Sequence, residues 1–449
     1  MGGEVPDGWQ VWSLYDVADY INGRATRPSE VQRYGVPVIK IAELNGGISP
    51  STDRIPVHAV AERHWVRDGD LLFAWSGSVG IFRYRGPAAA LNQHIFRVVA
   101  RPGIDQRFLR YLLEGQMPTF LGFAENKKTT MGHVTIRDLK ATHTAVPPLS
   151  EQRAIAHILG TLDDKIELNR RMSETLEAMA RALFQAWFVD FEPVRAKMEG
   201  RWRRGESLPG LPAHLYDLFP ERLVDSELGE IPEGWEVGTL GRFFEVGLGG
   251  AWGDDAATTR ASIAVRCLRG IDCHDLAEGR IPQVPVRWVS PKQAADRELL
   301  DGTILIEGSG SFCGRSMIWR QDYSALIGKP VIYSNFCKRL NPVCSGSQAV
   351  ICWMQLRQAY RDGLLQSFRT GTAFPNFDVH SALASFIVTV PPDSIAAEFA
   401  KMFGLSQRLD LMAQSRTLAA LRDALLPKLI SGELRVKDAE RFLERAGLT

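Results

Sequence analysis

The chain has 449 residues, of which 45% are hydrophobic and 23% charged, and its formal net charge is +1. This composition is typical of a globular protein with a sizeable core, and the length indicates about three domains. No stretch approaches about eighteen uninterrupted apolar residues and residues 1–12 lack the pattern of a signal peptide, which argues against a membrane-spanning helix and favours the cytoplasm.

The first part of the chain carries a series of landmarks. Residues 5–11 (VPDGWQV) begin it, and residues 68–73 (DGDLLF) then predict a turn and a strand that lead into the Ser-Gly-Ser of residues 76–78. Residues 146–148 (VPP) end a strand-like run and precede a helical pattern, as expected of a prolyl pair.

The same landmarks return in the same order later in the chain. Residues 231–237 (IPEGWEV), 301–306 (DGTILI), the Ser-Gly-Ser of 309–311 and residues 390–392 (VPP) match the first series one by one. We therefore interpret the chain as two diverged copies of one mixed domain, each followed by a helix.

The helices are expected at residues 149–188 and 393–432, where apolar residues recur at helical spacing. Some 38 helical residues would span roughly 57 Å. Each apolar stripe is too narrow for the interior of a large core, so we expect the two helices to pack on each other. The alternative is that each packs only on its own domain. If a pseudo-twofold axis relates the copies, the helices run antiparallel.

The expected fold class is α+β, with two mixed α/β domains in pseudo-twofold tandem separated by two long antiparallel helices that form a coiled coil. The predicted segments are a first domain (1–148), a first helix (149–188), a connector (189–230), a second domain (231–392), a second helix (393–432) and a C-terminal tail (433–449).

Motifs for catalysis are absent from the sequence. It has no GxxxxGK[ST] phosphate loop, no [DNS]PP[FYW] motif of amino-methyltransferases and no GxGxxG cofactor loop. The six cysteines form no CxxC pair, so we expect reduced thiols and no metal site. They are Cys267, Cys273, Cys313, Cys337, Cys344 and Cys352. We expect a chain that catalyses nothing and binds no cofactor itself.

The ordered landmarks resemble one family over roughly residues 4–435. The shared features are the [VI]P[DE]GW segments, the strand and Ser-Gly-Ser loops, and residues 147–152 (PPLSEQ), 187–193 (WFVDFEP) and 219–222 (FPER). With them the chain is similar to the specificity subunit of type I restriction-modification systems. It departs from the family at residues 391–395 (PPDSI), which lack the Glu-Gln of the first helix start.

The resemblance implies double-stranded DNA as a partner, together with two methyltransferase subunits bound through the helices. That complex would methylate adenines with S-adenosylmethionine. Two restriction subunits would add translocation and cleavage driven by ATP and Mg²⁺. Because the two domains differ in sequence, they should read the two halves of an asymmetric bipartite site, with the helices setting the spacer.

The net charge near zero neither indicates nor excludes DNA, so any contact must come from local placement of charge. We expect it on polar and basic loops, where Lys and hydroxyl groups suit phosphates and Arg and Asn suit base edges. In the first domain the candidates are Arg24, Thr26, Arg27, Ser76, Ser78, Lys127, Lys128, Thr129, Thr130 and His133. In the second they are Thr258, Thr259, Arg260, Ser309, Ser311, Arg369, Thr370, Thr372 and Asn376. The alternative for each is an ordinary solvated loop.

Three other functions remain open. The chain could serve a fused nuclease-methyltransferase instead of separate subunits. It could also be a coiled-coil scaffold carrying two protein-binding domains, which would lack salt-dependent DNA binding. A cryptic enzyme would methylate DNA without partners.

Overall fold

The computed structural model describes residues 5–125 and 132–445 of the chain. These residues divide into two compact units, unit 1 with residues 1–165 and 418–449 and unit 2 with residues 166–417. Unit 1 therefore joins the first part of the chain to its last residues, a grouping that the sequence patterns did not indicate.

Unit 1 contains two four-stranded sheets and one separate pair of strands. The first sheet is antiparallel, in the order β2 (Ala18–Asn22), β9 (Ile95–Ala100), β6 (Leu71–Ala74) and β7 (Gly80–Arg83). The second has the order β4 (Arg54–Ile55), β3 (Val36–Ile39), β8 (Ala89–Leu91) and β5 (Trp65–Val66), and its β3 and β8 are parallel. The separate pair is β1 (Gln10–Ser13) with β10 (His143–Val146).

Short helices cover the sheets of unit 1. They are α1 (Ile41–Gly46), α2 (Gln106–Gly115), α3 (Met117–Glu125) and α4 (Ile136–Ala141). Helix α2 begins after Asp105, whose carboxylate accepts hydrogen bonds from the amides of Arg107 and Phe108, as an N-cap aspartate should. Its buried face, which includes Leu109 and Leu112, lies in the core.

Unit 2 repeats this arrangement of strands. Its antiparallel sheet has the order β14 (Phe244–Val246), β20 (Cys337–Pro342), β17 (Ile304–Glu307) and β18 (Ser316–Ile318). Its mixed sheet has the order β16 (Val286–Val289), β15 (Ile263–Leu268) and β19 (Val331–Tyr333). The strand pairs are β13 (Glu236–Thr239) with β23 (Ile387–Val390), β11 (Leu223–Ser226) with β12 (Gly229–Pro232), and β21 (Arg369–Thr370) with β22 (Asn376–Phe377).

The helices of unit 2 pack around these sheets. They are α7 (Gly270–Ala277), α8 (Pro291–Asp296), α9 (Tyr323–Ile327), α10 (Gly346–Arg361), α11 (Val379–Ser385) and α12 (Asp393–Met402). The central helix α10 buries Trp353, Met354 and Leu356. The expected connector is part of this core, because α6 (Glu192–Met198) follows the first long helix and Trp202 is fully buried beside it.

The register of the two central sheets confirms the internal duplication. Leu71 of β6 lies opposite Val98 of β9, and Ile304 of β17 lies opposite Leu340 of β20. In both units the second and third strands of the second sheet, in the order given above, run parallel. The turn before each central strand uses a glycine with positive φ, 89° at Gly69 and 82° at Gly302.

The long helices are α5 (Leu149–Phe184), which continues as a π-helical turn (Gln185–Val189), and α13 (Leu405–Ser431), which α14 (Val436–Arg445) follows. The expectation of one continuous second helix was wrong. Gly404, with φ at 65°, separates α12 from α13, because a residue in the left-handed region ends helical hydrogen bonding. Pro427, by contrast, lies inside α13.

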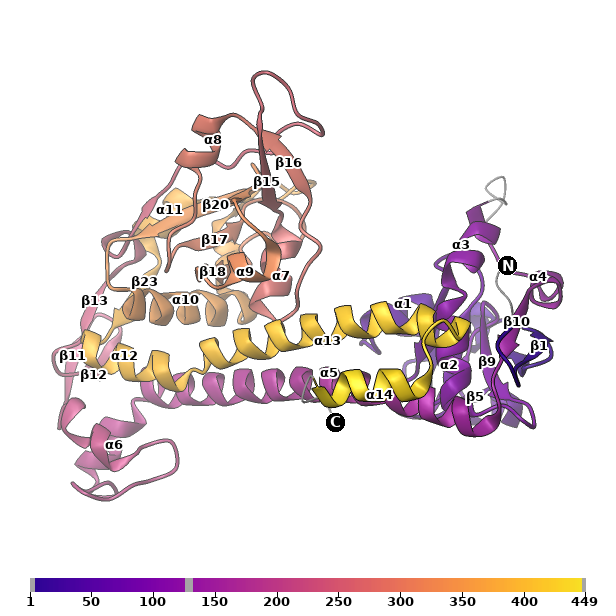
Figure 1. Ribbon diagram of the computed structural model, residues 1–449. Coiled ribbons are helices and arrows are strands. Elements are labelled where there is room, and N and C mark those ends of the chain that lie inside the picture. The colour runs from indigo at the N-terminus through magenta and orange to yellow at the C-terminus, as the bar shows by residue number, and fades with distance from the viewer. Residues whose placement is uncertain (1–4, 126–131, 446–449) are drawn as a thin grey trace. The chain divides into compact units, whose positions relative to one another are not determined.

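Within each unit the two long helices run antiparallel, as expected. In unit 1 the carboxylate of Asp163 accepts a hydrogen bond from Arg422 at 2.8 Å. Glu151, which precedes Asp163 on α5, pairs with Arg435, which follows Arg422 in the chain. In unit 2 Glu177 pairs with Arg408, and the earlier Asn169 donates to the later Ser415 at 3.3 Å. Both helices are visible in Figure 1.

Candidate nucleic-acid interface

The two loops of the first domain that the sequence marked separately lie together in unit 1. Ser76, in the Ser-Gly-Ser loop after β6, forms a bridge with His133. The amide of Gly77 donates to the carbonyl of Gly132 at 3.1 Å, and the amide of Val134 donates to the carbonyl of Trp75 at 2.8 Å. Backbone hydrogen bonds therefore hold the Ser-Gly-Ser loop after β6 against the segment before α4. We call this arrangement the junction.

Unit 2 repeats this junction in the same register. Ser309 bridges to Asn376, the amide of Gly310 donates to Pro375 at 2.9 Å, and the amide of Phe377 donates to Gly308 at 2.9 Å. In each domain, two loops that the sequence marked separately therefore lie together, although the loop sequences of the two domains differ.

A third segment joins each junction from the strand beside it. The amide of Trp75 donates to the carbonyl of His94 at 3.2 Å, and its equivalent, Gly308, donates to Phe336 at 2.7 Å. Two residues before these acceptors, the chain passes close to a glycine in both units. A Cβ on Gly23 would lie 2.1 Å from the carbonyl oxygen of Asn92, and one on Gly250 would lie 2.0 Å from that of Ser334.

In unit 1 this surface contains a pocket of about 400 Å³. Its walls come from the segments after β2, β3 and β8: Ala25, Thr26, Lys40, Ile41, Ala42, Asn92, Gln93 and His94. Among the described residues, the buried Thr26 Oγ1 and His94 Nδ1 have no hydrogen-bond partner. Such groups are costly unless something binds them, so the pocket suits a ligand with donors and acceptors.

Other predicted residues of the first domain are placed differently. Arg24 forms an ion pair with Glu30 and also donates to the carbonyl of Ala59, so its guanidinium holds the loop together instead of projecting from it. The hydrogen bond that Arg24 donates to the carboxylate of Glu30 lowers the pKa of Glu30. Arg27 and Ser78 are exposed. Lys127, Lys128, Thr129 and Thr130 lie outside the described residues.

The predicted residues of the second domain fall in two places. Thr258, Thr259 and Arg260 are exposed on a loop whose start, Asp254, pairs with Trp288 of β16. The others surround the junction. Ser311, Thr370, Thr372 and Asn376 are exposed, and Arg369 lies over the ring of Tyr360 at 5.7 Å. The hydroxyl of Thr370 donates to the carbonyl of Asn376 at 3.4 Å, which closes the β21–β22 hairpin.

Sequence reasoning missed the residues that flank each junction. In unit 1 they are Lys40, Trp75 and His94; the Trp75 ring lies 5.9 Å from that of His94. In unit 2 they are the exposed phenylalanines Phe312, Phe336 and Phe374. For the phenylalanines, a large apolar residue beside turn residues such as glycine would have been the available signal in the sequence.

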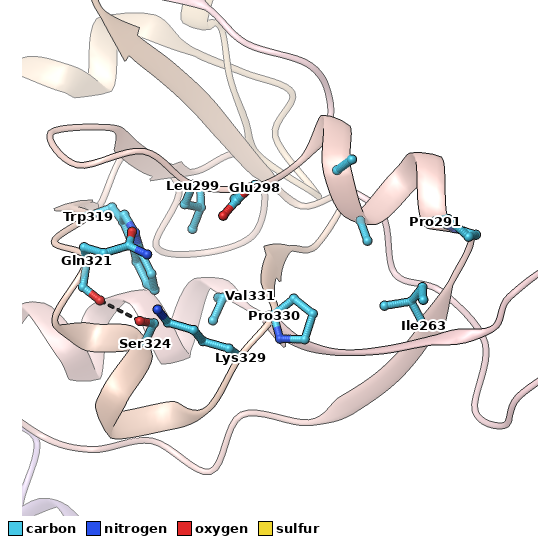
Figure 2. A pocket seen from close by; sticks show the side chains of 12 residues that line it. Ile263, Pro291, Glu298, Leu299, Trp319, Gln321, Ser324, Lys329, Pro330 and Val331 are labelled. Carbon is cyan, nitrogen blue, oxygen red and sulfur yellow. Dashed lines mark hydrogen bonds between the residues drawn. The ribbon is translucent and has the colours of Figure 1, made fainter.

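Unit 2 has a hollow of about 450 Å³. Figure 2 shows the side chains that line it. Its walls include Trp319, Ser324 and Lys329, and the Ser324 hydroxyl donates to the carbonyl of Gln321 at 2.6 Å. None of the predicted site residues lines it.

The described residues offer no metal site, disulfide or membrane-spanning helix. They hold no group of three or more His, Cys, Asp or Glu side chains that could bind a metal ion. All six cysteines are free. No helix within the described ranges is long and apolar enough to cross a membrane.

Known proteins share this chain's sequence and fold. A family model described as the type I restriction modification DNA specificity domain matches residues 6–178. The specificity subunit of the type I restriction enzyme MjaIX from Methanocaldococcus jannaschii is 23% identical, over 97% of this chain and 96% of its own length. That of HindI from Haemophilus influenzae is 23% identical over 70% of this chain and 74% of its own length.

A solved structure agrees with the fold. The crystal structure of a type I restriction-modification S subunit from M. genitalium matches with a TM-score of 0.50 and 16% identity, covering 95% of this chain and 98% of that one. The duplicated topology, the paired helices and these relatives lead to one conclusion. Over nearly its whole length the chain is similar to type I restriction-modification specificity subunits, and residues 6–178 match the DNA specificity domain of that family.

Proposed function

We propose that this chain is the sequence-specific DNA-binding subunit of a type I restriction-modification complex, in which each recognition domain reads one half of an asymmetric bipartite site. The observation that carries the proposal is the junction of three loops, built with the same backbone hydrogen bonds in both domains but with different side chains. Two related domains that recognise different DNA sequences require the same backbone framework with different side chains in contact with the bases.

The long helices would set the spacer between the two halves and bind methyltransferase subunits. Their surface in unit 2 supports the second role, because Leu168, Met172 and Met179 of α5 are exposed. A groove of about 560 Å³ lies between α5 and α13 there, lined by Leu168, Arg171, Met172, Thr175, Leu176, Gln407, Asp410, Leu411 and Gln414. Flexible apolar side chains in such a groove suit an apolar face of another protein.

The chain itself would catalyse nothing. S-adenosylmethionine would belong to two methyltransferase subunits, and ATP and Mg²⁺ to two restriction subunits. This division follows from the family and from the sequence, which lacks the phosphate-loop and methyltransferase motifs. A DNA partner also favours a cytoplasmic location. A single fused nuclease-methyltransferase in place of the separate subunits is the alternative arrangement.

Mapping of methylated adenines tests the proposal. A host carrying the chain and its partner subunits should show methylation at a bipartite motif with a fixed unread spacer, and deletion of the chain should abolish it. In purified form, the complex of the full chain with methyltransferase subunits should bind that duplex with an affinity that falls steeply as salt rises. An unchanged methylation pattern, or salt-independent binding, would instead support a protein scaffold.

A further inference from the structure

We propose that the second recognition domain reads its half-site through apolar contact with thymine methyl groups, made by Phe312, Phe336 and Phe374. The first domain would read its half through hydrogen bonds. This inference rests on the proposed DNA-reading function and assigns a different recognition chemistry to each half.

The three phenylalanines are among the most exposed large apolar residues of unit 2. The exposed fractions are 55% for Phe312, 53% for Phe336 and 63% for Phe374. Isolated exposed apolar residues are common, but these three come from separate loops that meet at one place. They form a group that we call the phenylalanine cluster.

Backbone hydrogen bonds fix the loops that carry the cluster. Phe336 accepts a hydrogen bond from the amide of Gly308 at 2.7 Å, and Phe374 precedes Pro375, which accepts one from Gly310 at 2.9 Å. Phe312 follows Gly310 on the same loop, and the Arg315 guanidinium lies 4.3 Å from the centre of its ring. All three therefore belong to the junction that the Ser-Gly-Ser loop forms.

Positive charge beside the cluster favours DNA as the occupant over an apolar protein surface. A Cβ on Gly308 would lie 3.0 Å from Cε of Lys338, which forms no ion pair with any described residue, whereas Arg315 beside Phe312 is paired with Glu307. The Nε of Arg369 is buried and has no hydrogen-bond partner in the described part of the chain. Exposed apolar side chains beside a lysine without an ion-pair partner match a groove edge bordered by phosphates.

At the position of Phe336 the first domain carries a polar side chain, whereas Val79 takes the place of Phe312. His94 stands where the second domain has Phe336, and the adjacent pocket offers the unpartnered hydroxyl of Thr26. In the major groove only thymine presents a methyl group, whereas the other bases present donors and acceptors. The phenylalanine cluster therefore selects thymine, whereas His94 and the side chains that line the pocket beside it select hydrogen-bonding edges.

Replacement of thymine by deoxyuridine tests this inference, because it removes the methyl group and leaves the pairing edge intact. The full chain in complex with methyltransferase subunits would bind duplexes that carry uracil in one half-site at a time. The half that stays unchanged when residues 1–148 are exchanged for those of a homologue is the half read by the second domain. We expect about fourfold weaker binding for each contacted methyl removed from that half, equivalent to about 0.8 kcal/mol, and no change for the other half.

Variants of the chain complete the test. Phe336→Ala should weaken binding to the thymine duplex and reduce its sensitivity to uracil. Leu300→Ala is the matched control, because Leu300 is 68% exposed and precedes β17 at the end away from Gly308. Uracil without effect in the second half, or an undiminished uracil effect in Phe336→Ala, would overturn the inference while the DNA-reading function stands. Failure to bind the unmodified duplex would refute both.

Discussion

Glu177 of α5 accepts a hydrogen bond at 2.7 Å from the guanidinium of Arg357 on α10, and both side chains are buried. Arg408 of α13 donates to the other oxygen of the same carboxylate, and Arg357 also donates to Glu278 at 2.8 Å. One carboxylate thus joins both long helices of unit 2 to the central helix of its recognition domain.

Glu177→Ala should strongly destabilise unit 2. Removal of the carboxylate leaves the two buried guanidinium groups of Arg357 and Arg408 without this partner, and such a loss costs about 3 to 5 kcal/mol. Hydrogen exchange of the α10 amides would measure the change in free energy of opening. Glu174→Ala, at an exposed position of the same helix, should change it by less than about 0.5 kcal/mol. Equal effects of the two substitutions would contradict the role assigned to Glu177.

The pairing of the helices in unit 1 depends on a different contact. Asp163 accepts hydrogen bonds from Arg422 at 2.8 Å and from the hydroxyl of Tyr111 at 2.8 Å. Arg422→Met should cost about 1 to 3 kcal/mol and speed hydrogen exchange in residues 418–431, because Asp163 loses the partner on α13. Lys428→Met, at an exposed site on the same helix, should leave the exchange rates unchanged.

The close approaches at Gly23 and Gly250 should tolerate no side chain. Gly250→Ala would place a Cβ 2.0 Å from the carbonyl oxygen of Ser334, which forces the loop away from the junction. We expect a loss of about 1 to 3 kcal/mol in stability, and weaker binding to the half-site of the second domain. Gly249→Ala is the control, since nothing lies within 4 Å of its new Cβ. Gly23→Ala should affect only the other half-site, and a thermal melt with a binding assay would detect both effects.

Stability below about pH 4.5 should depend on Glu167. Hydrogen bonds from Arg170 and Arg171 lower the pKa of Glu167 to about 2, against the opposing effect of partial burial. Because the folded-state pKa lies below the unfolded value, this contribution is complete above about pH 4.5 and is lost as the pH falls towards 2. The unfolding free energy of Glu167→Gln should therefore fall less steeply over this range than that of the unchanged protein. Glu245→Gln, at an exposed site, should keep the original slope.

Much of the fold was predictable because its landmarks depend on local chemistry. The glycines of the DG turns adopt positive φ in both copies, and the prolyl pairs stand where strands give way to helices. The helical stripes predicted a partner helix, and a pseudo-twofold relation of the two copies predicted its antiparallel direction. The break at Gly404 was not predicted, because one glycine inside a helical pattern is usually tolerated and only its positive φ reveals the end of α12.

The candidate interface was harder to predict. Ser76 and His133, like Ser309 and Asn376, were marked as separate loops, and only the tertiary fold places them in register. Arg24 has a residue type suited to DNA, but its ion pair with Glu30 could not be inferred from spacing alone. The phenylalanine cluster was not predicted because its members are far apart in the sequence and the first copy has no phenylalanine at the corresponding positions.

The central claim is that each domain independently reads one half of the target. Exchange of residues 1–148 for the corresponding domain of a homologue, followed by mapping of methylated adenines, tests this claim most directly. One half of the bipartite motif should change while the other half and the spacer length stay the same. A motif in which both halves change, or neither, would contradict it.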